Sequence, residues 1–153
     1  MTQKKKRNIC LLVIIFTLCL IWGHSAMSRA TSTDESSLVM DILTPFLEIF
    51  VGKGNVTIYL VRKLAHITEY FVLGSEVYVY LRLSGDQIIS KTNWGLMVGR
   101  VLLCGLIVAF LDETIQIFSG RGPQIVDIWI DLFGVVIACA ICSFITFIKG
   151  KTK

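Results

Sequence analysis

Two residues that can do chemistry, His66 and Glu69, stand three positions apart at the start of a long apolar run. An imidazole and a carboxylate can exchange protons, pair as charges or bind a metal ion. On a helix they would share one face with Arg62, and Glu76 would continue that face two turns further along. The stretch KLAHITEYF therefore predicts a polar stripe on a helix that is otherwise apolar.

Two further segments carry the same kinds of side chain. In LDETIQIFSGRGP, Gln116 follows Asp112 by four residues and Glu113 by three, so a helix would place all three close together. In VDIWIDLFG, Asp127 and Asp131 are one helical turn apart and lie on one side. Acidic groups thus occur in three separate segments of the chain.

A basic residue, Arg121, stands at the tip of the turn SGRGP, where Gly120 and Gly122 allow backbone conformations that other residues resist. A guanidinium here could reach lipid phosphates at the headgroup level, or it could hold a ligand phosphate or carboxylate through two hydrogen bonds. The sequence leaves both roles open.

The composition indicates which elements must position these groups. Hydrophobic residues make up 54% of the 153 residues and charged residues 17%, and the mean hydropathy is +0.72. These values argue against a water-soluble globule and indicate that lipid surrounds most of the chain. The chain has no basic stripe with interleaved aromatic residues, which argues against a nucleic-acid partner.

The cysteines behave as small hydrophobic residues, because all of them fall in or beside apolar runs: Cys10, Cys19, Cys104, Cys139 and Cys142. Their odd number and their spacing give no disulfide framework and no zinc pattern. Cys139 and Cys142 form a CxxC pair, but helix packing explains it better than redox chemistry, since no βαβ context surrounds it.

Four apolar segments predict four transmembrane helices, at about residues 9–27, 64–83, 96–118 and 125–148. The last three have the roughly 20 residues needed to cross the hydrocarbon layer. A spanning backbone must satisfy its own hydrogen bonds, and no alternating barrel pattern is present. The sequence therefore predicts an all-α integral membrane four-helix bundle that forms one domain over residues 1–153.

The first of these segments also resembles a secretory signal, with a basic start, a short apolar stretch and the sequence SRA at 28–30. Cleavage there would leave three spans. Trp22 stands where an interfacial aromatic residue would, which favours a retained first span.

Lysine and arginine are concentrated at the two ends of the chain, in KKKR and KGKTK. The positive-inside rule then places both termini in the cytoplasm and the segments 26–63 and 119–125 outside. The sequence thus predicts a multi-pass protein of the cytoplasmic (plasma) membrane. In this topology the second span begins, the third ends and the fourth begins at the outer side, so their polar groups lie at one depth.

These polar groups must have partners, because a carboxylate in the hydrocarbon layer costs on the order of 2.5–3.5 kcal/mol even on lenient insertion scales. We therefore expect four acids to face one another or a water-filled cavity: Glu69, Asp112, Glu113 and Asp131. Either Arg62 and Arg121 neutralise the acids in a closed structural network, or some basic groups bind an anion while the acids share a proton or a metal ion. The convergence of three segments favours a functional site.

The segment between the first two predicted spans has two parts. The polar stretch SRATSTDESS contains no core-forming residues, whereas LVMDILTPFLEIF places Leu38, Ile42 and Phe46 at helical spacing. The second part predicts an amphipathic helix on the outer leaflet, broken or kinked at Pro45. A lid packed over the bundle is equally consistent with this pattern.

Small residues in the apolar runs would let helices approach closely: Gly74, Gly99, Gly105 and Gly134. Such contacts fit packing within one chain. They fit an oligomer equally well.

With these residues assembled, the chain resembles the VanZ-like family of small bacterial membrane proteins. The resemblance is carried by RKLAHITEYFVLG, by LDETIQIFSGRGPQIVDIWIDLFG and by the four-span length, and it covers the chain from the second predicted span onward. It implies the following characteristic residues: Lys63, His66, Glu69, Asp112, Glu113, Gln116, Arg121, Asp127 and Asp131.

The resemblance also implies a link to resistance against teicoplanin and related lipoglycopeptides, with which the namesake of the family is associated through a mechanism that is not established. The chain departs from the family mainly in GHSAMSRATST, where relatives often have a short Ser/Gln-rich segment. Glu76 belongs to no motif of the family.

Three functions stay open on these grounds. The first is an outer-leaflet protein that modulates glycopeptide and lipoglycopeptide susceptibility by acting on a lipid-linked cell-wall precursor, a phospholipid headgroup or the lipoglycopeptide itself. The second is a membrane-embedded hydrolase or transferase with a lipid-linked or phospholipid substrate, and the third is a small transporter or accessory subunit. Whether the chain is an enzyme stays undecided, and so does a divalent metal cofactor, since no HExxH or similar signature is present.

Overall fold

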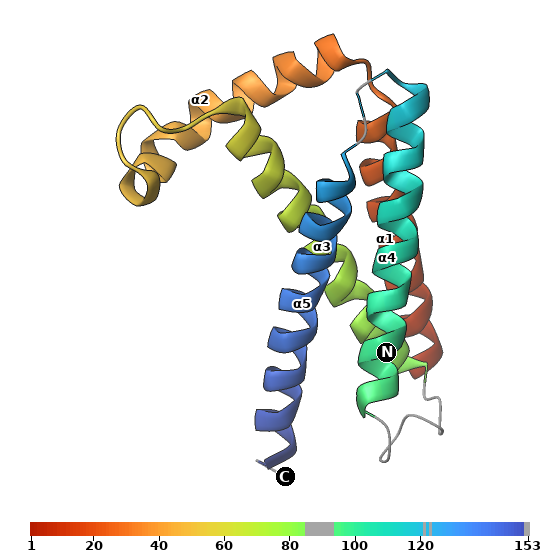
Figure 1. Cartoon of the computed structure of the whole chain (residues 1–153). Coiled ribbons are helices and arrows are strands. Elements are labelled where there is room, and N and C mark those ends of the chain that lie inside the picture. The colour runs from red at the N-terminus through yellow and green to blue at the C-terminus, as the bar shows by residue number, and fades with distance from the viewer. Residues whose placement is uncertain (85–93, 121, 123, 152–153) are drawn as a thin grey trace.

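The computed structural model describes residues 1–84, 94–120, 122 and 124–151, apart from the side chains of residues 29, 30, 150 and 151. Over this part of the chain it is all-helical, as the sequence predicts (Figure 1). The helices are α1 (Gln3–Ala26), α2 (Arg29–Val51), α3 (Ile58–Leu83), α4 (Trp94–Phe118) and α5 (Ile125–Lys151).

Within the residues that the structure describes, three helices are long and apolar enough to cross a membrane: Gln3–Ala26, Trp94–Phe118 and Ile125–Lys149. They coincide with the first, third and fourth predicted spans. The helix α3 has 26 residues, which is sufficient length, but His66, Glu69 and Glu76 lower the hydropathy of its apolar stretch. The structure therefore supports three spans by length and composition, and a four-helix bundle stays a prediction.

The helices run in alternating directions along the bundle. In Figure 1, α1 and α4 run upward, α3 and α5 run downward, and both termini lie at the lower end. Among the described residues α3 contacts each of the other four helices, and its longest interface is with α5. The central helix of the fold is thus the one that carries the polar stripe.

Close contact between α3 and α5 depends on a glycine. A Cβ atom on Gly134 would lie 2.5 Å from the backbone oxygen of Ile67, closer than atoms can approach. Gly105 and Gly74 likewise pack against residues of α5, whereas Gly99 has nothing within 4 Å of the place its Cβ would occupy. Three of the four predicted contact glycines therefore pack within the chain, and Gly99 does not.

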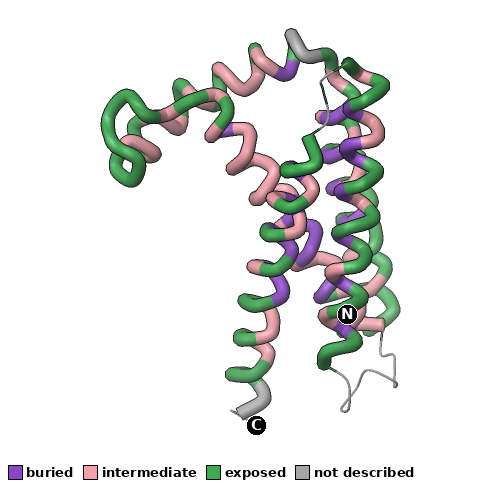
Figure 2. Tube along the Cα trace, in the orientation of Figure 1, coloured by how far each residue is buried: buried purple, intermediate pink, exposed green. Residues whose placement is uncertain are grey.

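Side chains divide between an inward and an outward face on each long helix (Figure 2). Tyr70 and Val135 are fully buried in the interior, and Phe16, Phe110 and Phe144 are among many large apolar residues that stay exposed. Apolar outward faces of this extent are typical of helices surrounded by lipid.

The helix α2 begins earlier than the sequence predicts, at Arg29, because the Ser28 hydroxyl caps it by accepting from the backbone N–H of Thr31. The polar stretch SRATSTDESS is thus mostly helical. Of the predicted break or kink at Pro45, the break is wrong, since the helix continues through this residue. Proline has no backbone N–H, so the helix continues without the hydrogen bond from residue 45 to the Asp41 carbonyl.

Candidate functional site

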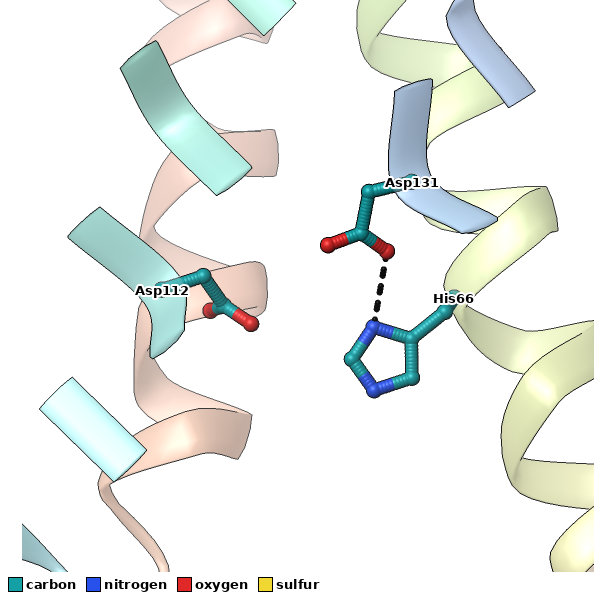
Figure 3. Close-up of side chains that lie close together, drawn as sticks. All are labelled: His66, Asp112 and Asp131. Carbon is teal, nitrogen blue, oxygen red and sulfur yellow. Dashed lines mark hydrogen bonds and ion pairs between the residues drawn. The ribbon is translucent and has the colours of Figure 1, made fainter. Parts of the chain in front are cut away.

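Three of the predicted site residues meet between α3, α4 and α5 (Figure 3). A ring nitrogen of His66 and one carboxylate oxygen each from Asp112 and Asp131 lie within 4.8 Å of one another. His66 Nδ1 is 2.9 Å from Asp131 Oδ1. Both aspartates have an exposed fraction of 0%. We refer to His66, Asp112 and Asp131 as the buried cluster.

Hydrogen bonds from two helices hold Asp112 in place. The Ser25 hydroxyl of α1 donates to Asp112 Oδ1 at 2.6 Å, and Gln116 Nε2 donates to Asp112 Oδ2 at 3.1 Å. Gln116 also donates to Glu113 Oε1 at 3.3 Å, as its predicted spacing from both acids suggests. Ser25 was not among the predicted residues, because nothing in its own neighbourhood indicates that α1 would reach the site.

Glu113 lies at the edge of the buried cluster. Its Oε2 accepts a hydrogen bond of 2.8 Å from the backbone N–H of Gln124, just before α5 begins. The side chain thereby ties the end of α4 to the start of α5. In this structure Glu113 acts as a link between the two helices that hold Asp112 and Asp131.

Lys63 and Asp127 form a separate ion pair between α3 and α5, through Nζ and Oδ1. Both side chains are largely buried, at 11% and 9% exposure. The Lys63 ammonium also lies 4.7 Å from the centroid of the Tyr59 ring and donates to Gln124 Oε1 at 3.4 Å. The sequence predicted both residues for the site, and the structure places them as a pair that fastens one end of the α3–α5 interface.

Glu69 bonds to a histidine, but its partner is on α1. Glu69 Oε1 is 3.2 Å from His24 Nδ1, and His24 Nε2 is 2.9 Å from Glu35 Oε2 on α2. His66 therefore pairs with α5 while Glu69 pairs with α1, although both lie on one helix face. The sequence analysis missed His24 and Glu35, and their only signal is that both are titratable residues near the predicted outer end of the first span.

A small cavity of about 70 Å³ lies between α1, α2 and α3. His24 and Glu69 line one side of it, and α2 covers it with Ser32, Glu35, Ser36 and Val39. The ring of His66 also lines this cavity, so one residue belongs to both the cavity and the buried cluster. The first half of α2 thus contributes one wall of this cavity.

Arg62 of α3 donates hydrogen bonds to the first half of α2. Its Nη2 donates to Ser32 Oγ at 3.0 Å, and its Nε donates to Ser36 Oγ at 3.3 Å. These bonds run to hydroxyls of α2, and the neutralisation of the acids by Arg62 stays a prediction. Arg121, the other predicted basic partner, lies outside the described residues.

Glu76 lies apart from the other acids, deeper along α3. The Thr17 hydroxyl of α1 donates to Glu76 Oε1 at 2.9 Å. The predicted continuation of the polar face is thus an α1–α3 contact below the buried cluster.

Comparison with known proteins identifies one family. The family VanZ/LLP1 matches residues 10–146, which is most of the chain. Neither the comparison with curated proteins nor that with solved structures gave a match. The chain belongs to the VanZ/LLP1 family.

Proposed function

We propose that this VanZ/LLP1 family member is a multi-pass protein of the cytoplasmic membrane that lowers susceptibility to glycopeptides and lipoglycopeptides through its polar site. The observation that carries the proposal is the meeting of His66, Asp112 and Asp131 in a buried layer next to the cavity under α2. Ionisable residues inside a membrane bundle are costly to bury, and they generally mark a functional site.

The proposed topology has four crossings and forms one membrane domain over residues 1–153. The helices α1 and α4 run in the same direction, so the chain has to return along the bundle between them, and α3 makes this return (Figure 1). With α3 as the fourth crossing, both lysine-rich ends lie on one side, which the positive-inside rule makes cytoplasmic. The site and α2 then face the outer leaflet.

The proposed place of α2 is the surface of that leaflet. The helix leaves the bundle at the end opposite the termini (Figure 1). A row of large apolar side chains on it stays exposed: Leu38, Ile42, Phe46, Ile49 and Phe50. An exposed apolar row on a helix with charged neighbours is typical of helices that lie in the interface.

The size of the cavity limits which ligands it can hold. A water molecule takes up about 30 Å³ of the liquid, and pockets for drug-sized molecules measure roughly 300–1,000 Å³. A cavity of about 70 Å³ is too small for a glycopeptide. We therefore propose that the site acts on the small polar headgroup of a phospholipid or a lipid-linked cell-wall precursor, and that the antibiotic is affected indirectly.

Inhibitory concentrations of teicoplanin and a lipoglycopeptide, measured in a susceptible Gram-positive host, test this function. The host would express the parent chain, Glu69→Gln, Asp112→Asn or Asp41→Asn, the last being a matched control because Asp41 is exposed on α2. We expect protection from the parent and from Asp41→Asn, and its loss in the two site variants at equal membrane abundance. Lack of protection by the parent, or full protection by Asp112→Asn, would contradict the proposal.

A second candidate function is a membrane-embedded hydrolase or transferase that acts on a lipid-linked pyrophosphate or a phospholipid. It is favoured by the contact between His66 and Asp131, since an imidazole held by a carboxylate can serve as a general acid or base. Purified protein would be assayed for release of phosphate or headgroup from these substrates. Turnover that disappears in His66→Gln would support this function, and absence of turnover in the parent would rule it out.

A further inference from the structure

We infer that His66, Asp112 and Asp131 bind a divalent transition-metal ion of the kind that accepts both nitrogen and oxygen ligands, as Zn²⁺ does. The inference goes beyond the proposed function and does not depend on any effect on antibiotics. It rests on the geometry of the three side chains, on one carboxylate oxygen and on the charge of the buried cluster.

The geometry brings three ligand atoms around one point. They come from three different helices and lie within 4.8 Å of one another (Figure 3). Zinc binds nitrogen and carboxylate oxygen at about 2.0–2.2 Å in a tetrahedral arrangement, so two ligand atoms of one ion are roughly 3.4 Å apart. The side chains would have to move inward by less than about one ångström to surround an ion.

One carboxylate oxygen points to a missing ligand. Asp131 is fully buried, and its Oδ2 has no hydrogen-bond partner among the residues that the structure describes. Figure 3 shows this oxygen directed away from His66 and towards Asp112. An unsatisfied buried polar atom costs about 1–3 kcal/mol, and an ion between the two carboxylates would satisfy it.

The charge of the buried cluster also favours a cation. The described hydrogen bonds to Asp112 come from the neutral groups of Ser25 and Gln116, which do not themselves balance the charge of a carboxylate. A divalent ion would balance the two aspartates while His66 binds as a neutral imidazole. One imidazole and two carboxylates suit Zn²⁺ better than Ca²⁺ or Mg²⁺, which prefer oxygen ligands alone.

The surroundings resemble those of metal sites that do chemistry. Ser25 and Gln116 orient Asp112 as outer partners orient metal ligands. Three protein ligands leave a fourth position on zinc for water or a substrate. His66 lines the cavity under α2, so a ligand in that cavity would lie beside the ion.

The test uses the full chain, purified in detergent and freed of metal with a chelator. Metal content after dialysis against Zn²⁺ gives the stoichiometry, and the visible absorption of added Co²⁺ reports nitrogen and oxygen coordination. Asp131→Asn is compared with Asp41→Asn, because Asp41 is exposed on α2 and only Asp131 belongs to the buried cluster. His66→Gln and His24→Gln form a second matched pair.

We expect roughly one Zn²⁺ per parent chain. Affinity should fall at least about tenfold in Asp131→Asn and His66→Gln, since changes to outer partners of a ligand alone typically cost that much. Asp41→Asn and His24→Gln should bind like the parent. Circular dichroism and gel filtration identify a variant that fails to fold, in which case the other pair decides. A parent that binds neither ion, or control variants that lose as much affinity as the cluster variants, would overturn the inference.

Discussion

The interface of α3 with α4 and α5 differs from α2 in how its polar groups are accommodated. Asp112 and Asp131 are fully buried, whereas the His24 and Glu35 side chains that join α1 to α2 are 43% and 41% exposed. A polar group at the interface must find a protein or metal partner, because water cannot replace a lost one. A polar group under α2 can exchange its partner for water at little cost.

This difference suggests a division of roles between the two regions. The interface is held by close backbone contact at Gly134 and by buried pairs, so it should be rigid and sensitive to substitution. The helix α2 is held by half-exposed hydrogen bonds from Arg62 and His24, so it should be able to move away from the cavity. We expect the interface to determine stability and α2 to determine access.

The largest expected effect is at the Lys63–Asp127 pair. Lys63→Met would leave the buried Asp127 carboxylate without its cation, and removing one partner of a buried pair typically costs about 3–5 kcal/mol. The free energy of unfolding, measured by denaturant titration in detergent micelles, should fall accordingly. The double variant Lys63→Met/Asp127→Leu should recover most of the loss. An unchanged single variant would show that the pair contributes nothing to the interface.

The next effect concerns the α3–α5 contact itself. In Gly134→Ala the new Cβ would lie 2.5 Å from the Ile67 backbone oxygen, and such overpacking typically costs about 1–3 kcal/mol. Gly99→Ala is the matched control, because nothing lies within 4 Å of its Cβ position. The temperature of thermal unfolding in detergent should be lower for Gly134→Ala than for the parent, and unchanged or higher for Gly99→Ala. Equal unfolding temperatures for the two variants would contradict a rigid α3–α5 interface.

The sequence predicted the helices and the meeting of the polar segments better than it predicted the partners. Apolar length gave helices close to the observed bounds of α4 and α5, and a shared depth brought His66, Asp112 and Asp131 together. Spacing on one helix shows which residues share a face, but it does not show which neighbouring helix each one reaches. His66 and Glu69 share one face of α3, and yet they bond to α5 and α1.

Other contributions depend on tertiary packing and have no local signal. Ser25 and His24 join the site only because α1 packs against α3 and α4. The early start of α2 was missed because Ser and Thr are weak helix formers, while the cap at Ser28 and the contacts with Arg62 stabilise the helix in place. Capping and long-range hydrogen bonds thus outweighed local preference here.

A smaller effect on stability is expected at the His24–Glu35 contact. Glu35→Gln removes an ion pair between half-exposed side chains, and such pairs typically contribute about 0–1 kcal/mol. The free energy of unfolding in detergent should change little. The inhibitory concentration of teicoplanin should fall towards that of cells without the protein, because α2 would cover the cavity less firmly. Asp34→Asn, a nearby change on α2, is the control. A large loss of stability in Glu35→Gln would mean that α2 is part of the rigid structure.

The smallest effect on stability should come from the apolar row of α2. Ile42 and Phe46 are 70% and 65% exposed, so Ile42→Ser/Phe46→Ser should change the free energy of unfolding in detergent by less than about 0.5 kcal/mol. In lipid nanodiscs the backbone amide hydrogens of residues 29–51 should exchange with solvent faster in this variant than in the parent, because the apolar row would no longer hold α2 on the bilayer. The exchange of α3 should not change.

The comparison between detergent and nanodisc separates two ways of holding α2. If lipid holds the helix, the double serine variant changes exchange only where a bilayer is present, and Asp41→Asn on the same helix changes nothing. If contacts with α3 alone hold it, exchange over residues 29–51 is the same in parent and variant. The second result would make α2 a lid packed on the bundle, and it would contradict the proposed place of this helix on the surface of the outer leaflet.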